Sequence, residues 1–165
     1  MSSELRRLAA TARDTEAFGA QLARARPPGE GLLVIELSGD LGAGKTTLVR
    51  GFLRECAVGG PVRSPTYTLV ETYTPGSTTF VHLDLYRLRD SSELENLGLR
   101  DWAEPGYLWL IEWPERGAGR LPPADLSVRL SAQAHDHLIE ATGRTPAGRA
   151  WLAAMAAVEI ASSGP

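Results

Sequence analysis

Residues 39–46 read GDLGAGKT, and their types and spacing are suited to holding phosphate groups. They fit the pattern G-x-x-x-x-G-K-[ST] without a mismatch. The glycines allow backbone N–H groups to point inward around a phosphate, and the start of a following helix favours negative charge. In such a loop Lys45 reaches the β- and γ-phosphates and the Thr46 hydroxyl binds Mg²⁺. We therefore predict a nucleotide site here.

Lys45 is the only lysine among the 17 basic residues of the chain; the other 16 are arginines. The two cations differ in shape and hydration, and a planar guanidinium does not fit the place of a slim ammonium between phosphate oxygens. The lone lysine thus stands where the chemistry requires one. Its uniqueness also excludes a conventional GTPase, because the guanine-reading motif N/T-K-x-D needs a second lysine.

Two acidic residues, Asp84 and Glu112, stand at the ends of apolar runs that read as strands. The carboxyl ends of such strands face the phosphate loop in α/β proteins. Mg²⁺ at a phosphate loop also needs a carboxylate from a neighbouring strand. We predict that one of these acids holds the metal and that the other orients the attacking water. At this point the residues alone do not assign the two roles.

The hydrophobic pattern predicts alternating helices and strands around these residues. Helices are predicted at 14–26, 45–57 and 146–158, and a short one at 92–97, opened by a capping box at Ser92 and closed by Gly98. Strands are predicted at 32–37, 69–74, 78–84, 107–113, 126–132 and 137–142. This order indicates an α/β protein, a three-layer P-loop NTPase fold with a mixed, mostly parallel central sheet flanked by helices. We expect one domain over residues 1–165.

Composition narrows the range of partners. The net charge is −3, and the arginines form no run or stripe of the kind that proteins use to bind nucleic acid directly. No apolar stretch approaches the roughly 20 residues of a membrane span. The start of the chain lacks the apolar core of a signal peptide. We expect a cytoplasmic protein without a membrane partner, in which the single Cys56 is a plain core thiol.

Two activities then remain. A small-molecule kinase would need a lid with closely spaced arginines, and Arg87 and Arg89 are the nearest approach to one. The alternative is a compact ATPase whose bound nucleotide changes its fit to a partner protein.

The motifs favour the second activity through a resemblance. The segments SGDLGAGKTTLVRGFL, SPTYTLVETY, HLDLYRL, ELENLGLRD and LIEWPERG occur in the order and spacing of the bacterial TsaE (YjeE) family. The resemblance covers about residues 14–131. It implies an ATPase needed to form threonylcarbamoyladenosine at position 37 of tRNAs that read codons beginning with A. It further implies action with the TsaB–TsaD complex, so that tRNA is met only through that complex.

The resemblance also implies roles for particular residues. Thr46 and Glu112 hold Mg²⁺, and Asp84 is the acid tied to hydrolysis. Residues 64–68 resemble a switch loop in which Thr66 senses the γ-phosphate, and Trp113 is functionally sensitive in relatives. An adenine pocket is expected near residues 8–15. The phosphates of ATP are bound by Leu41, Gly42, Ala43, Gly44, Lys45 and Thr46.

Overall fold

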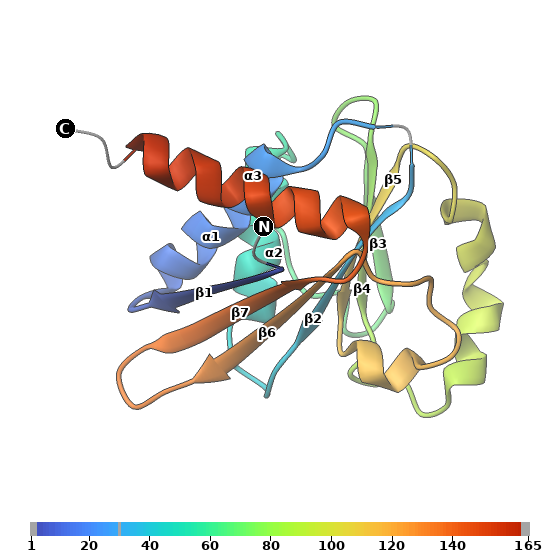
Figure 1. Cartoon of the computed structure of the whole chain (residues 1–165). Coiled ribbons are helices and arrows are strands. Elements are labelled where there is room, and N and C mark those ends of the chain that lie inside the picture. The colour runs from blue at the N-terminus through green and yellow to red at the C-terminus, as the bar shows by residue number, and fades with distance from the viewer. Residues whose placement is uncertain (1–2, 30, 163–165) are drawn as a thin grey trace.

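The computed structural model describes residues 3–29 and 31–162, which form a central sheet with helices on its faces (Figure 1). The strands are β1 (Glu4–Ala9), β2 (Leu33–Ser38), β3 (Val70–Tyr73), β4 (Thr79–Asp84), β5 (Tyr107–Glu112), β6 (Leu126–Ala132) and β7 (His137–Gly143). The α-helices are α1 (Ala12–Ala25), α2 (Lys45–Glu55) and α3 (Pro146–Ser162). Three 3₁₀ helices complete the set: η1 (Ser91–Leu97), η2 (Leu99–Trp102) and η3 (Pro114–Gly117).

The sheet has seven strands in the order β1-β7-β6-β2-β5-β4-β3. Strands β6, β2, β5 and β4 form a parallel block, and antiparallel pairs extend it at both edges. Strand β2 lies in the middle of this block, between β5 and β6. The predicted mixed, mostly parallel sheet is confirmed. Because β2 leads directly into the phosphate loop, the loop emerges beside the carboxyl ends of β5 and β4.

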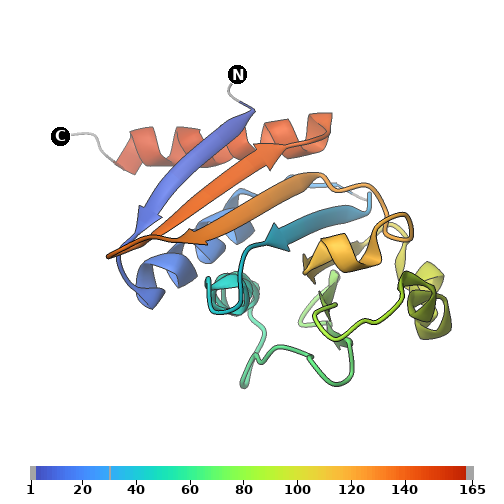
Figure 2. The ribbon, with the colours of Figure 1, turned by 90° about the horizontal axis from the view of Figure 1, so that it is seen from below.

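The helices form a layer on each side of the sheet, although the two layers differ. All three α-helices contribute side chains to one core, together with Ile35, Leu37 and Leu110 from the central strands. A second core on the opposite face joins Val34, Val81 and Trp109 to residues of the 3₁₀ segments. Figure 2 shows the α-helices behind the sheet and the 3₁₀ segments in front of its β2–β5–β4 part. Within the described residues, the outer strands β1, β7 and β6 have helices on one face alone.

Helices α1 and α2 approach each other closely because glycines stand at their contact. A Cβ added to Gly19 would lie 2.1 Å from the Leu48 carbonyl oxygen, and one added to Gly51 would lie 2.0 Å from the Glu16 carbonyl oxygen. No side chain fits at either position. This contact fixes α2, and with it the phosphate loop at its start, against the first helix.

Two local predictions need correction. The cap of the short helix is Asp90 rather than Ser92: the Asp90 carboxylate accepts from the Ser92 N–H at 2.8 Å, and Glu93 completes the capping box. The segment is also a 3₁₀ helix rather than an α-helix.

Strand β1 was not predicted at all, because its inward positions include Arg7 and its pattern of apolar residues is weak. The strand forms because its backbone pairs with β7 along its whole length.

The prediction of one domain over residues 1–165 reaches beyond the described residues, because residues 1, 2, 30 and 163–165 lie outside them. It stays a prediction. Across residues 3–29 and 31–162, none of the helices has both the length and the apolar character needed to cross a membrane.

Candidate functional site

The phosphate loop joins β2 to α2 and takes a backbone conformation that requires glycine. Gly39, Gly42 and Gly44 have φ angles of 141°, 78° and 104°, which L side chains rarely adopt. A Cβ at Gly39 would also lie 2.2 Å from the Leu130 carbonyl oxygen. The loop is therefore built for close approach of backbone, as a phosphate cradle demands.

Lys45 is the first residue of α2, and its side chain is folded back over the loop. Its Nζ donates to the carbonyl oxygens of Gly39 at 2.6 Å and Asp40 at 2.9 Å. The same Nζ lies 4.3 Å from the centroid of the Trp113 ring. Burial lowers the pKa of Lys45, and the nearby carboxylates of Glu112 and Asp84 oppose part of this shift.

The two predicted acids stand side by side at the ends of neighbouring parallel strands. Asp84 on β4 is paired in register with Glu112 on β5, and both side chains are buried. Glu112 Oε1 accepts a hydrogen bond from Thr46 Oγ1 at 2.8 Å. The structure thus brings together the three residues predicted to lie around the metal and the attacking water.

The Thr46–Glu112 pair fits a magnesium site. Mg²⁺ binds hard oxygen ligands at about 2.1 Å in an octahedron, so adjacent ligand oxygens lie about 3 Å apart. Thr46 Oγ1 and Glu112 Oε1 already have nearly this spacing. Both are oxygen donors, and one is anionic, which is the ligand chemistry that this ion prefers.

Asp84 is held by the loop that precedes β3. Ser64 Oγ donates to Asp84 Oδ2, and Thr66 Oγ1 lies 3.3 Å from Ser64 Oγ as a donor to it. The backbone N–H of Tyr86 donates to Asp84 Oδ1 at 3.0 Å. The predicted switch-like segment 64–68 therefore contacts the predicted catalytic acid directly through Ser64.

Trp113 directly follows Glu112 and has a left-handed backbone conformation, with φ 58° and ψ 51°. Such a conformation is unusual for a bulky residue and costs free energy. It turns the chain out of the sheet and puts the indole over Lys45. The ring also packs against Tyr86, with centroids 5.0 Å apart, and Arg116 lies 5.7 Å from its centroid.

These groups surround a cavity of about 310 Å³. Its lining residues are Leu41, Gly42, Gly44, Lys45, Thr46, Thr47, Ser64, Thr66, Asp84, Tyr86, Glu112 and Trp113. Of the six residues predicted to bind the phosphates of ATP, Ala43 alone is outside this lining: its methyl group belongs to the core, and its N–H donates to the Asp40 carbonyl oxygen at 3.0 Å. Among the lining residues, Lys45 is the only cation, opposed by two carboxylates.

Sequence reasoning missed His82, whose side chain contacts Glu112. His82 Nε2 lies 2.6 Å from Glu112 Oε2, and the histidine is fully buried. A signal was present in the sequence: His82 precedes Asp84 by two residues on a strand, so the two side chains share one face. That alternation would have placed the imidazole on the same face of the sheet as Asp84.

The other predicted features lie at the edge of this site. A Cβ at Gly44 would lie 3.5 Å from Thr15 Cγ2, so the start of α1 adjoins the phosphate loop, where the adenine pocket is predicted. Arg87 is exposed and stacks on the Tyr67 ring, with its guanidinium carbon 4.5 Å from the centroid. Neither Arg87 nor Arg89 is among the residues that line the cavity.

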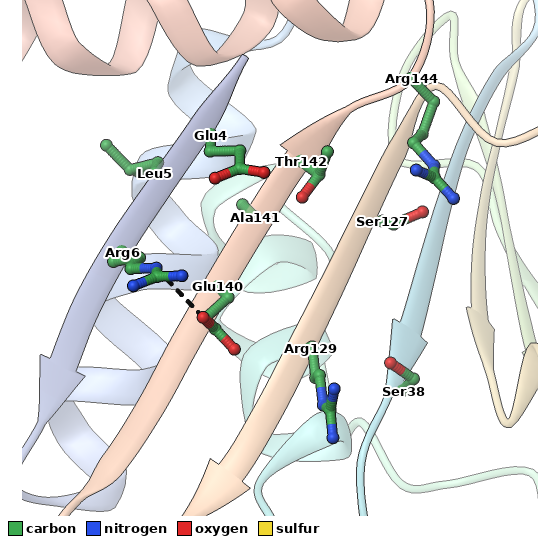
Figure 3. Close-up of a pocket in the computed structure, with 10 residues that line it drawn as sticks. All are labelled: Glu4, Leu5, Arg6, Ser38, Ser127, Arg129, Glu140, Ala141, Thr142 and Arg144. Atoms are coloured by element: carbon green, nitrogen blue, oxygen red, sulfur yellow. Dashed lines mark ion pairs between the residues drawn. The ribbon is translucent and has the colours of Figure 1, made fainter. Parts of the chain in front are cut away.

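A second hollow, of about 280 Å³, lies on the face of β1, β7 and β6 opposite the α-helices (Figure 3). It contains charges of both signs, and Arg6 Nε pairs with Glu140 Oε1 at 3.1 Å. Figure 3 shows Arg129 and Arg144 on the same surface, beside Ser38 and Ser127. With acids and arginines mixed, this hollow lacks the one-signed character of an anion site, and no predicted site residue lines it.

Comparison with known proteins shows consistent similarity. A family model described as "Threonylcarbamoyl adenosine biosynthesis protein TsaE" matches residues 9–141. A tRNA threonylcarbamoyladenosine biosynthesis protein TsaE from Haemophilus influenzae is 46% identical over 120 residues, which are 73% of this chain and 76% of that protein. The protein of the same name from Bacillus subtilis is 34% identical over 123 residues, covering 74% of this chain and 75% of the relative.

The fold is shared with a solved structure. The crystal structure of YdiB from Bacillus subtilis superposes with a TM-score of 0.77 at 25% sequence identity. The match covers 96% of this chain and 98% of the other.

Proposed function

Because this chain belongs to the TsaE family and acts in tRNA threonylcarbamoyladenosine biosynthesis, we propose that it does so as a Mg²⁺-dependent ATPase working with the TsaB–TsaD complex. The observation that carries the proposal is the convergence of Lys45, the Thr46–Glu112 pair and Asp84 on one cavity at the start of α2. Such a cavity has the parts that phosphoryl transfer to water requires.

The phosphate loop and Lys45 bind the triphosphate in this proposal. The backbone N–H groups of Gly42 and of Gly44 to Thr46 bind the phosphates, and Lys45 Nζ exchanges the Gly39 and Asp40 carbonyls for phosphate oxygens. The exchange is favourable because an anionic oxygen is a stronger acceptor for an ammonium than a neutral carbonyl.

Thr46 and Glu112 are the residues that would hold Mg²⁺, since their oxygens already have the spacing of adjacent ligands. When bound, the ion would neutralise charge that develops on the phosphate oxygens. The Glu112 carboxylate balances the ion's charge from the base of the cavity, where it is shielded from solvent.

Asp84 is proposed to orient the attacking water. Its carboxylate is buried at the cavity edge and accepts from both Ser64 and the Tyr86 N–H. These bonds fix the carboxylate and leave it acceptor capacity toward the cavity. Thr66, also in the cavity lining, is placed to sense the γ-phosphate through the same loop.

The proposed partner is a protein complex, with tRNA met only through it, in the cytoplasm. Two large apolar side chains are exposed here: Leu41, which lines the cavity, at 72%, and Tyr67, which follows the lining residue Thr66, at 85%. Large apolar groups at the edge of a functional cavity are typical of interaction surfaces. A partner docking there would contact the loop that holds Asp84, so nucleotide and partner binding would be coupled, and reciprocally so.

The partner would also supply positive charge that the cavity lacks. Lys45 is the one cation among the lining residues, so charge on the transferred phosphoryl group is poorly balanced in the isolated protein. An arginine supplied by a partner raises the rate about 10³-fold or more in other NTPases. We therefore expect slow hydrolysis alone and faster hydrolysis with TsaB–TsaD.

Two measurements test the proposal. Incubation with γ-labelled ATP and a bacterial metabolite extract should release inorganic phosphate and label no small molecule; a labelled acceptor that depends on this protein would establish a kinase instead. A non-hydrolysable ATP analogue should tighten association with TsaB–TsaD. Association that ignores nucleotide, with hydrolysis equally fast without the complex, would contradict the proposed partnership.

A further inference from the structure

His82 occupies a position that packing alone does not explain. Its side chain is fully buried on strand β4, yet its Nδ1 has no hydrogen-bond partner within the described part of the chain. A buried polar nitrogen without a partner costs free energy, and an apolar side chain of similar volume avoids that cost. The remaining interaction of the imidazole is the contact of Nε2 with Glu112.

The strand register explains how this contact forms. Asp84 is opposite Glu112, and His82 is opposite Leu110, on the neighbouring parallel strand β5. Side chains two residues apart share a face of the sheet, so His82, Asp84 and Glu112 all point toward α2. His82 therefore reaches Glu112 diagonally, from deeper in the sheet, while Thr46 reaches the same carboxylate from the cavity side.

The two oxygens of Glu112 are thus divided between two partners. A carboxylate can only accept, so His82 Nε2 carries the proton and donates it to Oε2. Oε1 is then the oxygen that faces Thr46 and the cavity. Without the first bond, the carboxylate is free to rotate about its terminal torsion, which is broad and only loosely restrained.

We infer that His82 is a positioning residue that holds the Glu112 carboxylate with Oε1 directed at the metal site. This rests on the proposed function, in which Glu112 and Thr46 hold Mg²⁺. The Nδ1 atom without a hydrogen-bond partner then lowers the stability of the fold, and in return the imidazole places a rigid donor behind a metal-binding carboxylate. Bonds of this kind to metal ligands contribute about 10- to 100-fold to metal affinity in other proteins.

The test uses a matched pair of variants, His82→Gln and His82→Met. Glutamine and methionine have similar length, but only the glutamine amide places an N–H donor near the position of Nε2. Affinity for a non-hydrolysable ATP analogue is measured by calorimetry with Mg²⁺ and with a chelator. The ratio of the two affinities, taken within one variant, cancels any loss of folded protein.

We expect His82→Met to lower this ratio about tenfold or more and His82→Gln to retain most of it. In a Glu112→Gln background, His82→Met should change the ratio no further, because the histidine acts through the carboxylate. His82→Leu serves as a second apolar variant, so that a folding defect peculiar to methionine does not decide the result.

The outcomes separate the two claims. If Glu112→Gln lowers the ratio but His82→Met and His82→Leu do not, the positioning role is wrong and the metal site stands. If Glu112→Gln also leaves the ratio unchanged, the proposed magnesium site is wrong, and the inference falls with it. A ratio equally low in His82→Gln and His82→Met would show that the imidazole acts by shape and not as a donor.

Discussion

The Lys45 ammonium lies 4.3 Å from the centre of the Trp113 indole ring, sandwiched between that ring and the carbonyls of its own loop. A cation over the face of tryptophan is stabilised by the ring quadrupole. The left-handed backbone of Trp113 makes this contact possible. The lysine is thus held in place by neutral partners that an anion can displace.

Binding of Mg·ATP should change the fluorescence of Trp113, because the ammonium that polarises the indole moves toward the phosphates. The signal is measured by titrating nucleotide into the protein and into Trp113→Phe. The tryptophans Trp102, Trp109 and Trp151 lie outside the cavity lining, so the variant should lose most of the response. A response that persists undiminished in Trp113→Phe would contradict this assignment.

Lys45→Ala should reduce Mg·ATP binding below detection in calorimetry. The substitution removes the only cation of the cavity lining and leaves Asp84 and Glu112 facing the triphosphate without a counter-charge. Arg87→Ala is the matched control, because the Arg87 guanidinium stacks on Tyr67 outside the cavity lining. This variant should bind nucleotide as the unaltered protein does. Unchanged affinity of Lys45→Ala for Mg·ATP would show that the phosphate loop is not part of the nucleotide site.

The two strand-end acids should separate in function. Glu112→Ala should weaken nucleotide binding only when Mg²⁺ is present, since its carboxylate contacts Thr46. Asp84→Asn should leave nucleotide bound and stop turnover, since the Asp84 carboxylate contacts Ser64 and the Tyr86 N–H and makes no contact with Thr46. Calorimetry and phosphate release measure the two effects. Equal loss of ATP binding in both variants would refute this division and leave only a shared role.

Gly51→Ala should destabilise the fold by about 1–3 kcal/mol, the usual cost of overpacking. An added methyl group would lie 2.0 Å from the Glu16 carbonyl oxygen, so α1 and α2 must separate, even though alanine favours helix more than glycine. Gly29→Ala is the control, because its Cβ meets nothing within 4 Å. Urea denaturation measures both; equal stability of the two variants would show that the helix contact is loose.

Cys56 should react slowly with thiol reagents near neutral pH. Burial raises the pKa of its thiol, although Arg26, whose Nη1 donates to Sγ at 3.1 Å, opposes part of the shift. Because the thiolate is the reactive form, the midpoint of the pH–rate profile should lie above that of a free cysteine. The unfolded protein in denaturant is the reference. Faster modification of the folded protein at neutral pH would contradict a core thiol.

The sequence predicted what local chemistry determines. The phosphate loop, its lysine and the acids at the ends of β4 and β5 each follow from a short motif and a strand boundary. Strand order does not, because the neighbours of β2 come from segments far downstream, and only tertiary packing selects them. The bond between His82 and Glu112 was hidden for the same reason: it depends on the register of two strands.

The first strand of the chain pairs with the last, since β1 lies beside β7 at the edge of the sheet, and β2 lies beside β6. Contacts so distant along the chain form slowly, because the chain loses the conformational entropy of the long intervening segment before the contact stabilises it. During synthesis the phosphate loop leaves the ribosome early, yet the strands that hold it arrive late. Ribosome-bound chains of increasing length should therefore retain nucleotide only once β6 and β7 have emerged, which makes ATP capture a measure of when the sheet closes around the phosphate loop.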